Sequence, residues 1–214
     1  MTALPRARPV RVVLEGRYTR LEPLSLAHAE GLYRAAADPL RFDYLFDVPP
    51  GNLADMRAWI ERSMKGEESL FHSVINRASG EATGRQSLMR IVPEHGVIEI
   101  GNILWGPAIS RTRISTEAFF LVARYVFDEL GYRRFEWKCN DRNEPSKAAA
   151  LRFGFTFEGV FRQHMWVKGR NRDTAWFAII DRDWPAIRAA FERWLDPANF
   201  DSDGRQKAKL AART

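Results

Sequence analysis

The sequence predicts a single α+β domain built on a mixed sheet, and three observations lead to this class. Short stretches that alternate apolar and polar residues, as strands do, are interspersed with segments whose apolar residues recur at the spacing of amphipathic helices. Three strand-like stretches follow one another between residues 70 and 105 with short turns between them, which favours an antiparallel meander. Two more, near the carboxyl end, are joined by a charged turn and favour a hairpin.

Size and composition agree with one domain. The chain has 214 residues, of which 45% are hydrophobic and 28% charged, enough to bury a sizeable core. We expect residues 1–9 to be a flexible N-terminus, residues 10–195 to form the domain, and residues 196–214 to be a polar, basic tail. The sequence has no apolar run that could span a membrane and no apolar segment typical of a signal peptide. A cytoplasmic protein without a membrane partner is expected.

Charge and cysteine content narrow the classes of function. The formal net charge is +6, but the Lys and Arg residues are spread along the chain, which argues against a nucleic-acid partner. An anionic small-molecule cofactor would also benefit from this charge. The single cysteine, Cys139, excludes internal disulfides and a cysteine-based zinc cluster, and the four histidines lack ligand spacing. We therefore expect no metal.

The N-terminal part is expected to contain two strands and two helices. Ser25 caps the first helix, Asp38-Pro39 ends it, and Asn52 caps the second. The expected bounds are strands 10–14 and 18–23 and helices 25–37 and 52–65. Residues 40–51, between the helices, form an irregular loop with three aromatic residues. This loop is interpreted either as a plug over the core or as a wall of a substrate site.

The remaining elements follow from the same patterns. The expected strands are 70–76, 86–92, 97–105, 134–138, 155–167 and 174–181, and the expected helices are 116–130, 143–153 and 183–195. Apolar residues surround most of helix 116–130, so it is expected to be largely buried. Gly131 and Gly154 are suitable residues to end the helices before them.

The polar stretch 110–117 lies between an apolar strand and this buried helix. The first turn of a helix has free backbone N–H groups, and Arg111, Arg113 and neighbouring hydroxyl residues add donors for a phosphate or diphosphate. The stretch is therefore a candidate site for a phosphorylated cofactor. An ordinary N-cap formed by Ser110, Ser115 or Thr116 explains the same residues equally well.

Two further features are candidate catalytic groups. Glu99 lies in the middle of a strand, where acidic residues are disfavoured, and a carboxylate on a partly buried sheet face suits a general base. An exposed position or an arginine partner would also explain it. Asn143 and Ser146 lie three residues apart at the start of a helix, hence on one side of its first turn. Helix capping alone is the simpler interpretation of this pair.

Together these stretches resemble the GNAT acyl-CoA N-acyltransferases. The resemblance covers residues 10–184 and is carried by Glu99-Ile100-Gly101 and the R-T-R-x-S-T-E-A turn at 111–118. The run from Asn143-x-x-Ser146 through Arg-Phe-Gly-Phe at 152–155 to Glu158-Gly159 is similar to the RimJ/RimL-like branch, the ribosomal-protein N-terminal acetyltransferases.

The resemblance implies a mostly antiparallel sheet with a V-shaped opening between two parallel strands. It implies acetyl-CoA as co-substrate and a primary amine, a protein N-terminus or a small amine, as acceptor. Glu99 would be the general base, Ser146 would protonate the leaving thiolate, and a backbone N–H near Leu104 would polarise the carbonyl. The residues implied in cofactor binding are Ile103, Leu104, Trp105, Arg111, Thr112, Arg113, Ser115, Thr116 and Asn143.

The phosphate turn departs from the family pattern. Alignment to the usual Arg/Gln-x-x-Gly-x-Gly/Ala turn places Arg113 at the key glycine and Ser115 at the last small position. A side chain there disfavours positive φ and close backbone approach. Side-chain donors of Thr112, Ser115 and Arg113 would compensate. The alternative function is a CoA-binding module with little or no transferase activity.

The acceptor is not encoded in a readable motif. Arg162, Arg170 and Arg172 suit an anionic acceptor, a subunit contact or a surface salt-bridge network, and a homodimer is left open. Cys139 would allow a covalent acyl-cysteine route, but no histidine accompanies it in a motif, so a buried structural thiol is favoured.

Overall fold

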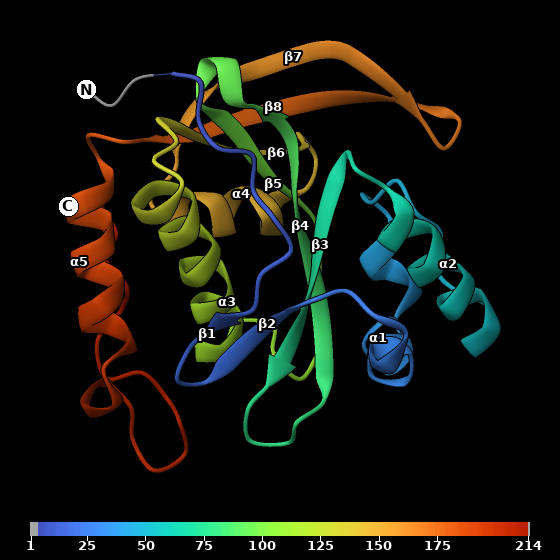
Figure 1. Cartoon of the computed structure of the whole chain (residues 1–214), viewed down its shortest axis with the longest axis horizontal. Coiled ribbons are helices and arrows are strands. Elements are labelled where there is room, and N and C mark those ends of the chain that lie inside the picture. Colours follow the sequence, from blue (N-terminus) through green and yellow to red (C-terminus); the bar gives the residue numbers. More distant parts are fainter. Residues whose placement is uncertain (1–3, 214) are drawn as a thin grey trace.

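The computed structural model describes residues 4–213 and contains an eight-stranded sheet with the strand order β1-β2-β3-β4-β5-β6-β8-β7 (Figure 1). All neighbouring strands are antiparallel except β5 and β6, which are parallel. Helices lie on both faces of the sheet. This arrangement confirms the predicted α+β class with a mixed, mostly antiparallel sheet. None of the helices in the described residues has the length and apolar character needed to cross a membrane.

The expected elements are present with shifted ends, except that only Leu14 of the predicted strand 10–14 lies in a strand, since residues 10–13 pair with no neighbour in the sheet. The N-terminal part contains β1 (Leu14–Glu15), β2 (Thr19–Pro23), η1 (Leu26–His28), α1 (Ala29–Ala35), η2 (Pro39–Phe42), α2 (Leu53–Lys65), β3 (Ser69–Asn76) and β4 (Ala82–Val92). The C-terminal part contains η3 (Pro93–His95), β5 (Val97–Trp105), α3 (Arg113–Arg124), the π-helical turn η4 (Tyr125–Glu129), β6 (Arg134–Asn140), α4 (Glu144–Arg152), β7 (Thr156–Val167), β8 (Arg170–Ile180), α5 (Trp184–Leu195) and η5 (Pro197–Asn199).

The hairpin between β7 and β8 is tighter than predicted. The charged stretch 168–173 was expected to be a turn, but only Lys168 and Gly169 connect the strands, and Val167 pairs with Arg170. Both turn residues have positive φ, 50° for Lys168 and 73° for Gly169, as the turns that match strand twist require. Arg172 therefore belongs to strand β8 rather than to a loop.

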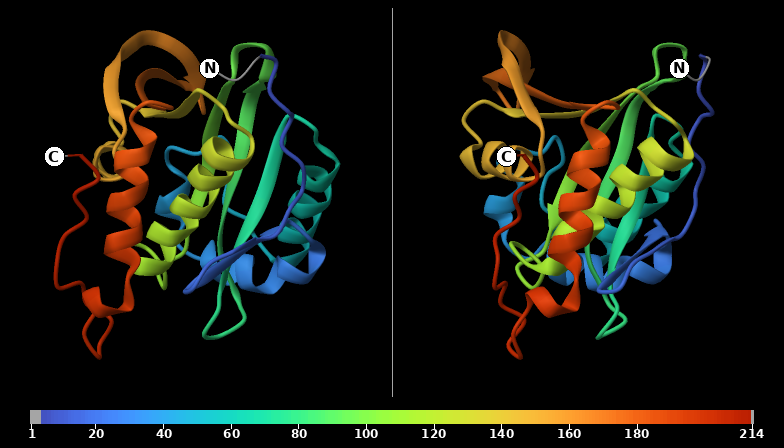
Figure 2. Two further views of the ribbon diagram at one scale, coloured as in Figure 1. Left: turned by 60° about the vertical axis from the view of Figure 1, so that its left-hand side comes forward. Right: turned by 90° about the vertical axis from the view of Figure 1, so that its left-hand side faces the viewer.

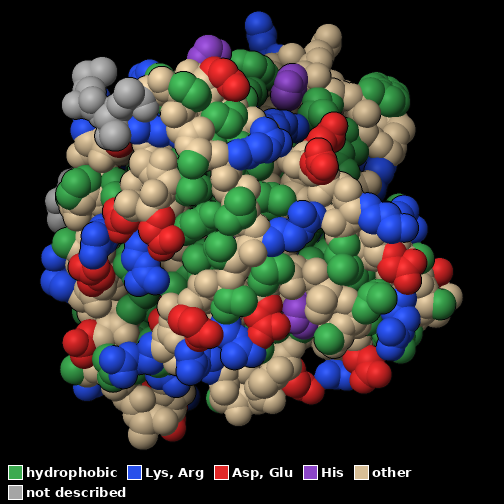
Figure 3. Space-filling view, viewed as in Figure 1, with side chains coloured by type: hydrophobic (Ala, Val, Ile, Leu, Met, Phe, Trp, Pro, Cys, Tyr) green, Lys and Arg blue, Asp and Glu red, His purple; other side chains and the backbone are tan. Residues whose placement is uncertain are grey.

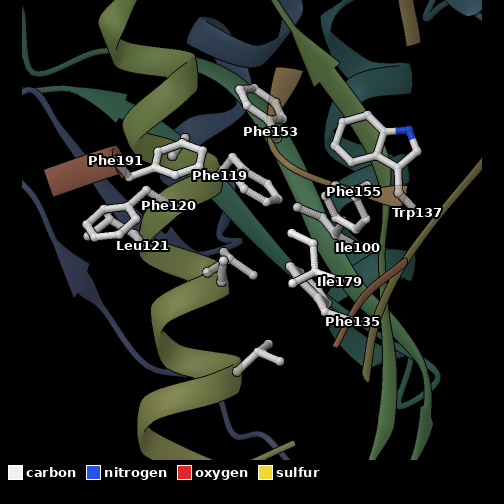
Figure 4. Packing of buried hydrophobic residues seen from close by; sticks show 14 of the residues in the cluster. Ile100, Phe119, Phe120, Leu121, Phe135, Trp137, Phe153, Phe155, Ile179 and Phe191 are labelled. Atoms are coloured by element: carbon white, nitrogen blue, oxygen red, sulfur yellow. The ribbon is translucent and has the colours of Figure 1, made fainter. Parts of the chain in front are cut away.

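Two hydrophobic clusters hold helices to the two faces of the sheet. On one face α3 and α5 pack in an aromatic core, in which the Phe119 and Phe153 rings stack with centroids 4.5 Å apart (Figure 4). α1 and α2 cover the other face (Figure 1). There Leu32 and Ile60 are buried in a cluster with residues of β3 and β4. Because α3 is apolar on most sides, it lies between the sheet and α5, and its N-terminus is fixed near the end of β5.

The C-terminal segment, expected to be a tail, packs back along α5 (Figure 2). Phe200 is buried against Trp194, with ring centroids 5.1 Å apart. Arg213 Nε donates a hydrogen bond to the Gly154 carbonyl at 2.6 Å, and its guanidinium pairs with Asp183. The few apolar residues of the segment hold it against α5, although its polar composition predicted a tail. Basic and acidic side chains are interspersed over the face shown in Figure 3, as their spread in the sequence predicts.

His72, on β3, makes stability depend on pH. Its side chain is 1% exposed, and desolvation lowers its pKa to about 4, with the Val12 backbone opposing this shift only in part. Since the unfolded chain takes up a proton near pH 6.5 and the folded chain does not, stability falls as the pH drops from about 6.5 to about 4. We expect the unfolding free energy to decrease by about 2 kcal/mol between about pH 7 and pH 5 from this group.

Denaturant titrations over this pH range check the expectation. A His72→Leu variant should lose this part of the pH dependence, whereas His95→Gln, at an exposed site, should keep it. If the unfolding free energy of His72→Leu depended on pH as steeply as that of the wild-type protein, the pH dependence would have another source.

Candidate active site

The candidate site is the opening between the two parallel strands. β5 and β6 pair only from Val97 with Arg134 to Ile100 with Trp137, whereas the rest of β6 continues to pair with β8. The strands therefore diverge beyond Ile100. The opening contains a cavity of about 120 Å³. It is lined by Arg41, Tyr44, Leu45, Phe46, Met89, Arg90, Glu99, Ile100, Gly101, Asn102, Ile103, Trp137, Lys138, Cys139, Asn140, Asn143, Ser146 and Arg172.

A bulge in β5 accompanies the divergence. Arg85 pairs with Leu104 and Ser87 with Gly101, so two residues of β5 lie opposite one residue of β4. Asn102, in the bulge, has a φ of 53°, and its side-chain amide donates to Ser87 Oγ at 3.0 Å. The bulge bends β5 away from β6 and so opens the sheet at this level.

Glu99 lies at the closed end of the opening and is 3% exposed. Arg90 Nη1 lies 2.9 Å from Oε1 and 2.8 Å from Oε2, and Lys138 Nζ lies 2.9 Å from Oε2. A carboxylate offers about four acceptor positions, so these contacts leave about one free, on Oε1. Gly101 is required by the packing next to Glu99, because a Cβ there would lie 2.5 Å from the Met89 sulfur. At the level of the sequence, a catalytic position and an arginine partner were alternative explanations of Glu99. In the structure Glu99 has an arginine partner and also lies in the cavity.

Lys138 connects Glu99 to a second carboxylate. Its Nζ lies 2.7 Å from Glu136 Oε2 and 3.8 Å from the Trp176 ring centroid. Sequence reasoning missed both Lys138 and Arg90. The alternation of Glu136 and Lys138 with apolar residues along β6 was a signal that one face of this strand is polar.

Ser146 faces the opening from α4. Asn143 caps this helix, and its Oδ1 accepts a hydrogen bond from the Ser146 backbone N–H at 3.1 Å. The Trp137 indole N–H donates to Ser146 Oγ at 3.0 Å, which leaves the hydroxyl proton for another acceptor, here the Cys139 sulfur. The hydroxyl lies beside Cys139. Burial raises the pKa of the Cys139 thiol, and the Ser146 hydrogen bond only opposes this, which favours a structural thiol over a nucleophile.

The N-terminus of α3 lies beyond the end of β5. Thr112 is its N-cap, and Thr112 Oγ1 accepts from the Ile114 N–H at 3.2 Å. The left-handed backbone position of this turn is Arg111, with a φ of 62°, and not Arg113, which is the first helical residue. The predicted conflict between a side chain and positive φ at Arg113 is therefore wrong for this structure.

Other side chains of the turn are engaged within the protein. Ser115 Oγ and Thr116 Oγ1 donate to the Thr112 carbonyl at 3.1 and 3.0 Å, and both residues are buried. The Arg113 guanidinium lies over the Tyr18 and Phe200 rings, 4.5 and 5.2 Å from their centroids. The structure thus does not place these side chains as the expected extra phosphate donors. The N–H groups of Thr112, Ile114 and Thr116 are also bonded within the protein, so the donors that remain in the described part of this turn are the N–H groups of Arg111, Arg113 and Ser115 and the exposed Arg111 side chain.

Arg41 lies beside the end of β5, where the pantetheine arm is expected to bind. The sequence did not predict this position for an arginine. Ile103 lines the cavity, whereas Leu104 points into the other core. The Trp105 carbonyl accepts from Arg41 Nη1 at 2.8 Å and from Ser110 Oγ at 3.0 Å. Both lone pairs of this carbonyl are therefore occupied.

The outer wall of the cavity comes from the aromatic loop and the β7–β8 hairpin. Phe42 is buried in the core, while Tyr44 and Phe46 line the cavity, so the loop is both plug and wall. Lys168 Nζ donates to the Phe42 carbonyl at 2.8 Å, and Tyr44 Oη donates to the Arg142 carbonyl at 3.2 Å. These contacts hold the wall to the hairpin and to the entrance of α4.

Comparisons with known proteins agree with this geometry. A family model described as an acetyltransferase (GNAT) domain matches residues 19–156. The crystal structure of a GCN5-related N-acetyltransferase from Brucella melitensis has 54% sequence identity and a TM-score of 0.95, covering 97% of this chain and 96% of that one. The uncharacterized N-acetyltransferase p20 of Bacillus licheniformis is 28% identical over 182 residues, 80% of this chain and 99% of the relative.

A further solved structure contains ligands. The microcin C7 self-immunity acetyltransferase MccE, in complex with acetyl-CoA and AMP, has 26% identity and a TM-score of 0.68, over 77% of this chain and 93% of that one. The family model spans more than half of the sequence, and the structure has the opened parallel strand pair and the helix N-terminus beside it. The chain therefore belongs to the GNAT acetyltransferase family.

Proposed function

We propose that the protein transfers the acetyl group of acetyl-CoA to a primary amine by direct attack of the amine on the thioester. The observation that carries this proposal is the cavity itself, because it brings the Glu99 carboxylate and the Ser146 hydroxyl to one space between β5 and β6. Sequence reasoning named both residues from separate stretches of the chain. Family membership and the acetyl-CoA complex of the relative MccE support the choice of co-substrate.

Acetyl-CoA would lie between the phosphate turn and the cavity. Within residues 111–116, at the positive end of the α3 dipole, the amides without a partner in the protein would bind the diphosphate. The pantetheine arm would run along the unpaired edge of β5 at Ile103, Leu104 and Trp105. Asn143 would keep the α4 entrance in place beside it. Arg41, which bridges Trp105 and Ser110, would fix the strand end relative to the phosphate turn.

The side chains supply the proton transfers. Glu99 would accept the proton of the attacking amine, directly or through a water, at the free position of Oε1. A backbone N–H near Leu104 would polarise the thioester carbonyl. Ser146 would turn its hydroxyl proton from Cys139 to the departing sulfur, since the Trp137 N–H bonds a lone pair of Oγ and does not use this proton.

Calorimetry with acetyl-CoA followed by product detection on a panel of amines tests the proposal. Binding together with acetylated product supports it. Binding without any product would instead support the alternative, a CoA-binding module with little or no transferase activity. Arg113 stands where the family pattern has glycine, and the Ser115 side chain is buried and bonded within the protein, so this alternative retains a specific observation behind it.

A Ser146→Ala variant tests the proton donor. We expect kcat to fall by about tenfold rather than more, because a thiolate with a pKa near 8.5 needs only modest help to leave. Ser202→Ala, at an exposed site in the C-terminal segment, is the control. Unchanged turnover in Ser146→Ala would remove this residue from the mechanism.

The RimJ/RimL-like branch is part of the proposal and rests on sequence resemblance, which is most specific in the stretch from Asn143 to Gly159 and includes Gly131-Tyr132-Arg133-Arg134. It suggests the α-amine of a protein as acceptor, with a small amine as the other candidate. The amine panel should therefore contain short peptides as well as small amines. A cytoplasmic location and an acceptor other than nucleic acid complete the proposal.

A further inference from the structure

Arg172 is a buried guanidinium that faces the cavity without an acidic partner. It lies on β8, is 7% exposed and lines the cavity. Its Nε is buried without a hydrogen-bond partner, and within residues 4–213 no ion pair or side-chain hydrogen bond is found for its guanidinium. Its close contact is the Phe46 ring, 4.8 Å from Cζ to the centroid. The surface salt-bridge network considered for this arginine is therefore not what the structure shows.

Comparison with a second buried arginine shows that the lack of an acidic partner at Arg172 is unusual. Arg85 is 2% exposed and also stacks on an aromatic ring, with Cζ 4.2 Å from the Trp59 centroid, but its guanidinium pairs with the Asp47 carboxylate. Burial of a charge without a partner costs several kcal/mol. Burial lowers the pKa of Arg172 and nearby Arg90 adds to this effect, while Cys139 and the Glu99 carboxylate oppose it only in part.

The cavity as a whole has surplus positive charge. Its lining contains Arg41, Arg90, Lys138 and Arg172 but one acidic residue, Glu99. Glu99 is already paired with Arg90 and Lys138, and it acts on Arg172 only through space, without a direct ion pair. The diphosphate is not the missing anion, because residues 111–116 of the phosphate turn are outside the cavity lining. The pantetheine arm is uncharged. The acceptor is the remaining source of negative charge.

We propose that the acceptor is an amine that also carries an anionic oxygen group, a carboxylate or a phosphate ester, which Arg172 binds while the amine faces Glu99. This inference rests on the proposed acetyl transfer. The planar guanidinium can bind either group through two parallel N–H donors. Phe46 stacks on it from the aromatic loop and excludes water from one side, which strengthens the interaction.

Matched pairs of amines test the proposal. One pair is γ-aminobutyrate and its carboxamide, and the other is two short peptides that differ only in beginning with Glu or with Gln. Phosphoethanolamine represents the phosphate esters. The wild-type protein should have the higher kcat/KM for the anionic member. In Arg172→Gln the ratio of anionic to neutral member should fall by about 10²-fold. Arg170→Gln is the control, since Arg170 is exposed on the same strand and should leave the ratio unchanged within about twofold.

The outcomes separate the anion site from other roles of Arg172. An equal fall for both members of a pair would mean that Arg172 acts on the reacting carbonyl oxygen or on the fold, and would overturn the proposal. So would a wild-type protein that prefers the neutral member. A preference for phosphoethanolamine would support the proposal and identify a phosphate ester as the group.

A binding measurement separates this proposal from acetyl transfer. Calorimetry of the wild-type protein with CoA, titrated with N-acetyl-γ-aminobutyrate or with the corresponding amide, needs no turnover. Tighter binding of the carboxylate in the wild type, lost in Arg172→Gln, supports the anion site even if no amine is acetylated. Acetylation of amines without any difference between the two ligands would retain the proposed function and reject the anion site.

Discussion

A Glu99→Gln variant is expected to acetylate amines about 10²- to 10³-fold more slowly than the wild-type protein. Glutamine has the shape of glutamate but cannot take a proton from the attacking amine. Arg90 and Lys138 occupy three of the carboxylate's acceptor positions, so the free position of Oε1 is the one at which the carboxylate can take up the amine proton. The loss should appear in kcat, because the base acts in the transition state.

The measurement is steady-state kinetics over a range of pH, with acetyl-CoA affinity determined by calorimetry. Glu94→Gln, on the exposed turn before β5, is the control and should retain full activity. The neutral amide in Glu99→Gln would face two cations without a balancing charge, so the melting temperature of the variant must be recorded beside its rate. A folded variant that binds acetyl-CoA and turns over at the wild-type rate at every pH would exclude Glu99 as the base.

A Glu117→Gln variant is expected to lower the unfolding free energy by about 4 kcal/mol, the largest stability effect that we predict. Glu117, on α3, is 4% exposed. Its carboxylate accepts hydrogen bonds from the backbone N–H groups of Arg17, Tyr18 and Thr19 at 2.8, 2.6 and 2.7 Å. Gly16 permits this approach, because a Cβ there would lie 2.6 Å from Oε2.

The effect is large because the three donors are fixed by the turn between β1 and β2. Glutamine would lose the charge and would place its NH₂ group against backbone N–H donors, which leaves buried donors without an acceptor. Urea titration near neutral pH measures the change. Glu129→Gln, exposed at the end of the π-helical turn η4, should change stability by less than about 0.5 kcal/mol. A loss below about 1 kcal/mol in Glu117→Gln would show that water or another group replaces these bonds.

Much of the fold could be predicted because its signals are local. The helical spacing of apolar residues in 116–130 and the alternation in 97–105 reflect repeats of one turn and of two residues, which are visible in a short window. The hairpin was predicted, but the predicted turn was too long. The residues after Gly169 are polar because both faces of β8 are exposed where the strand begins, so they do not show the alternation of a half-buried strand. The C-terminal segment was predicted as a tail because its composition is polar, although Phe200 anchors it.

The candidate site was also only partly predictable from the sequence. Glu99, Asn143 and Ser146 could be named from the sequence, because a carboxylate within a strand and polar residues at a helix start are local anomalies. Their partners could not. Arg90 meets Glu99 through the register of β4 and β5, and Lys138 meets it through the parallel pairing of β5 and β6. A pattern in one strand contains no record of the register of its neighbour.

The order of polar and apolar residues was thus sufficient to specify the α+β class, most of the elements and the stretches that carry the candidate catalytic groups. Folding in three dimensions settled which charges are paired and which are not. Arg162, Arg170 and Arg172 look alike in the sequence, but strand pairing leaves the first two exposed and buries the third in a cavity whose one carboxylate is already engaged. Burial and pairing depend on contacts between residues that are distant in the chain, and these contacts exist only after the strands and helices have packed.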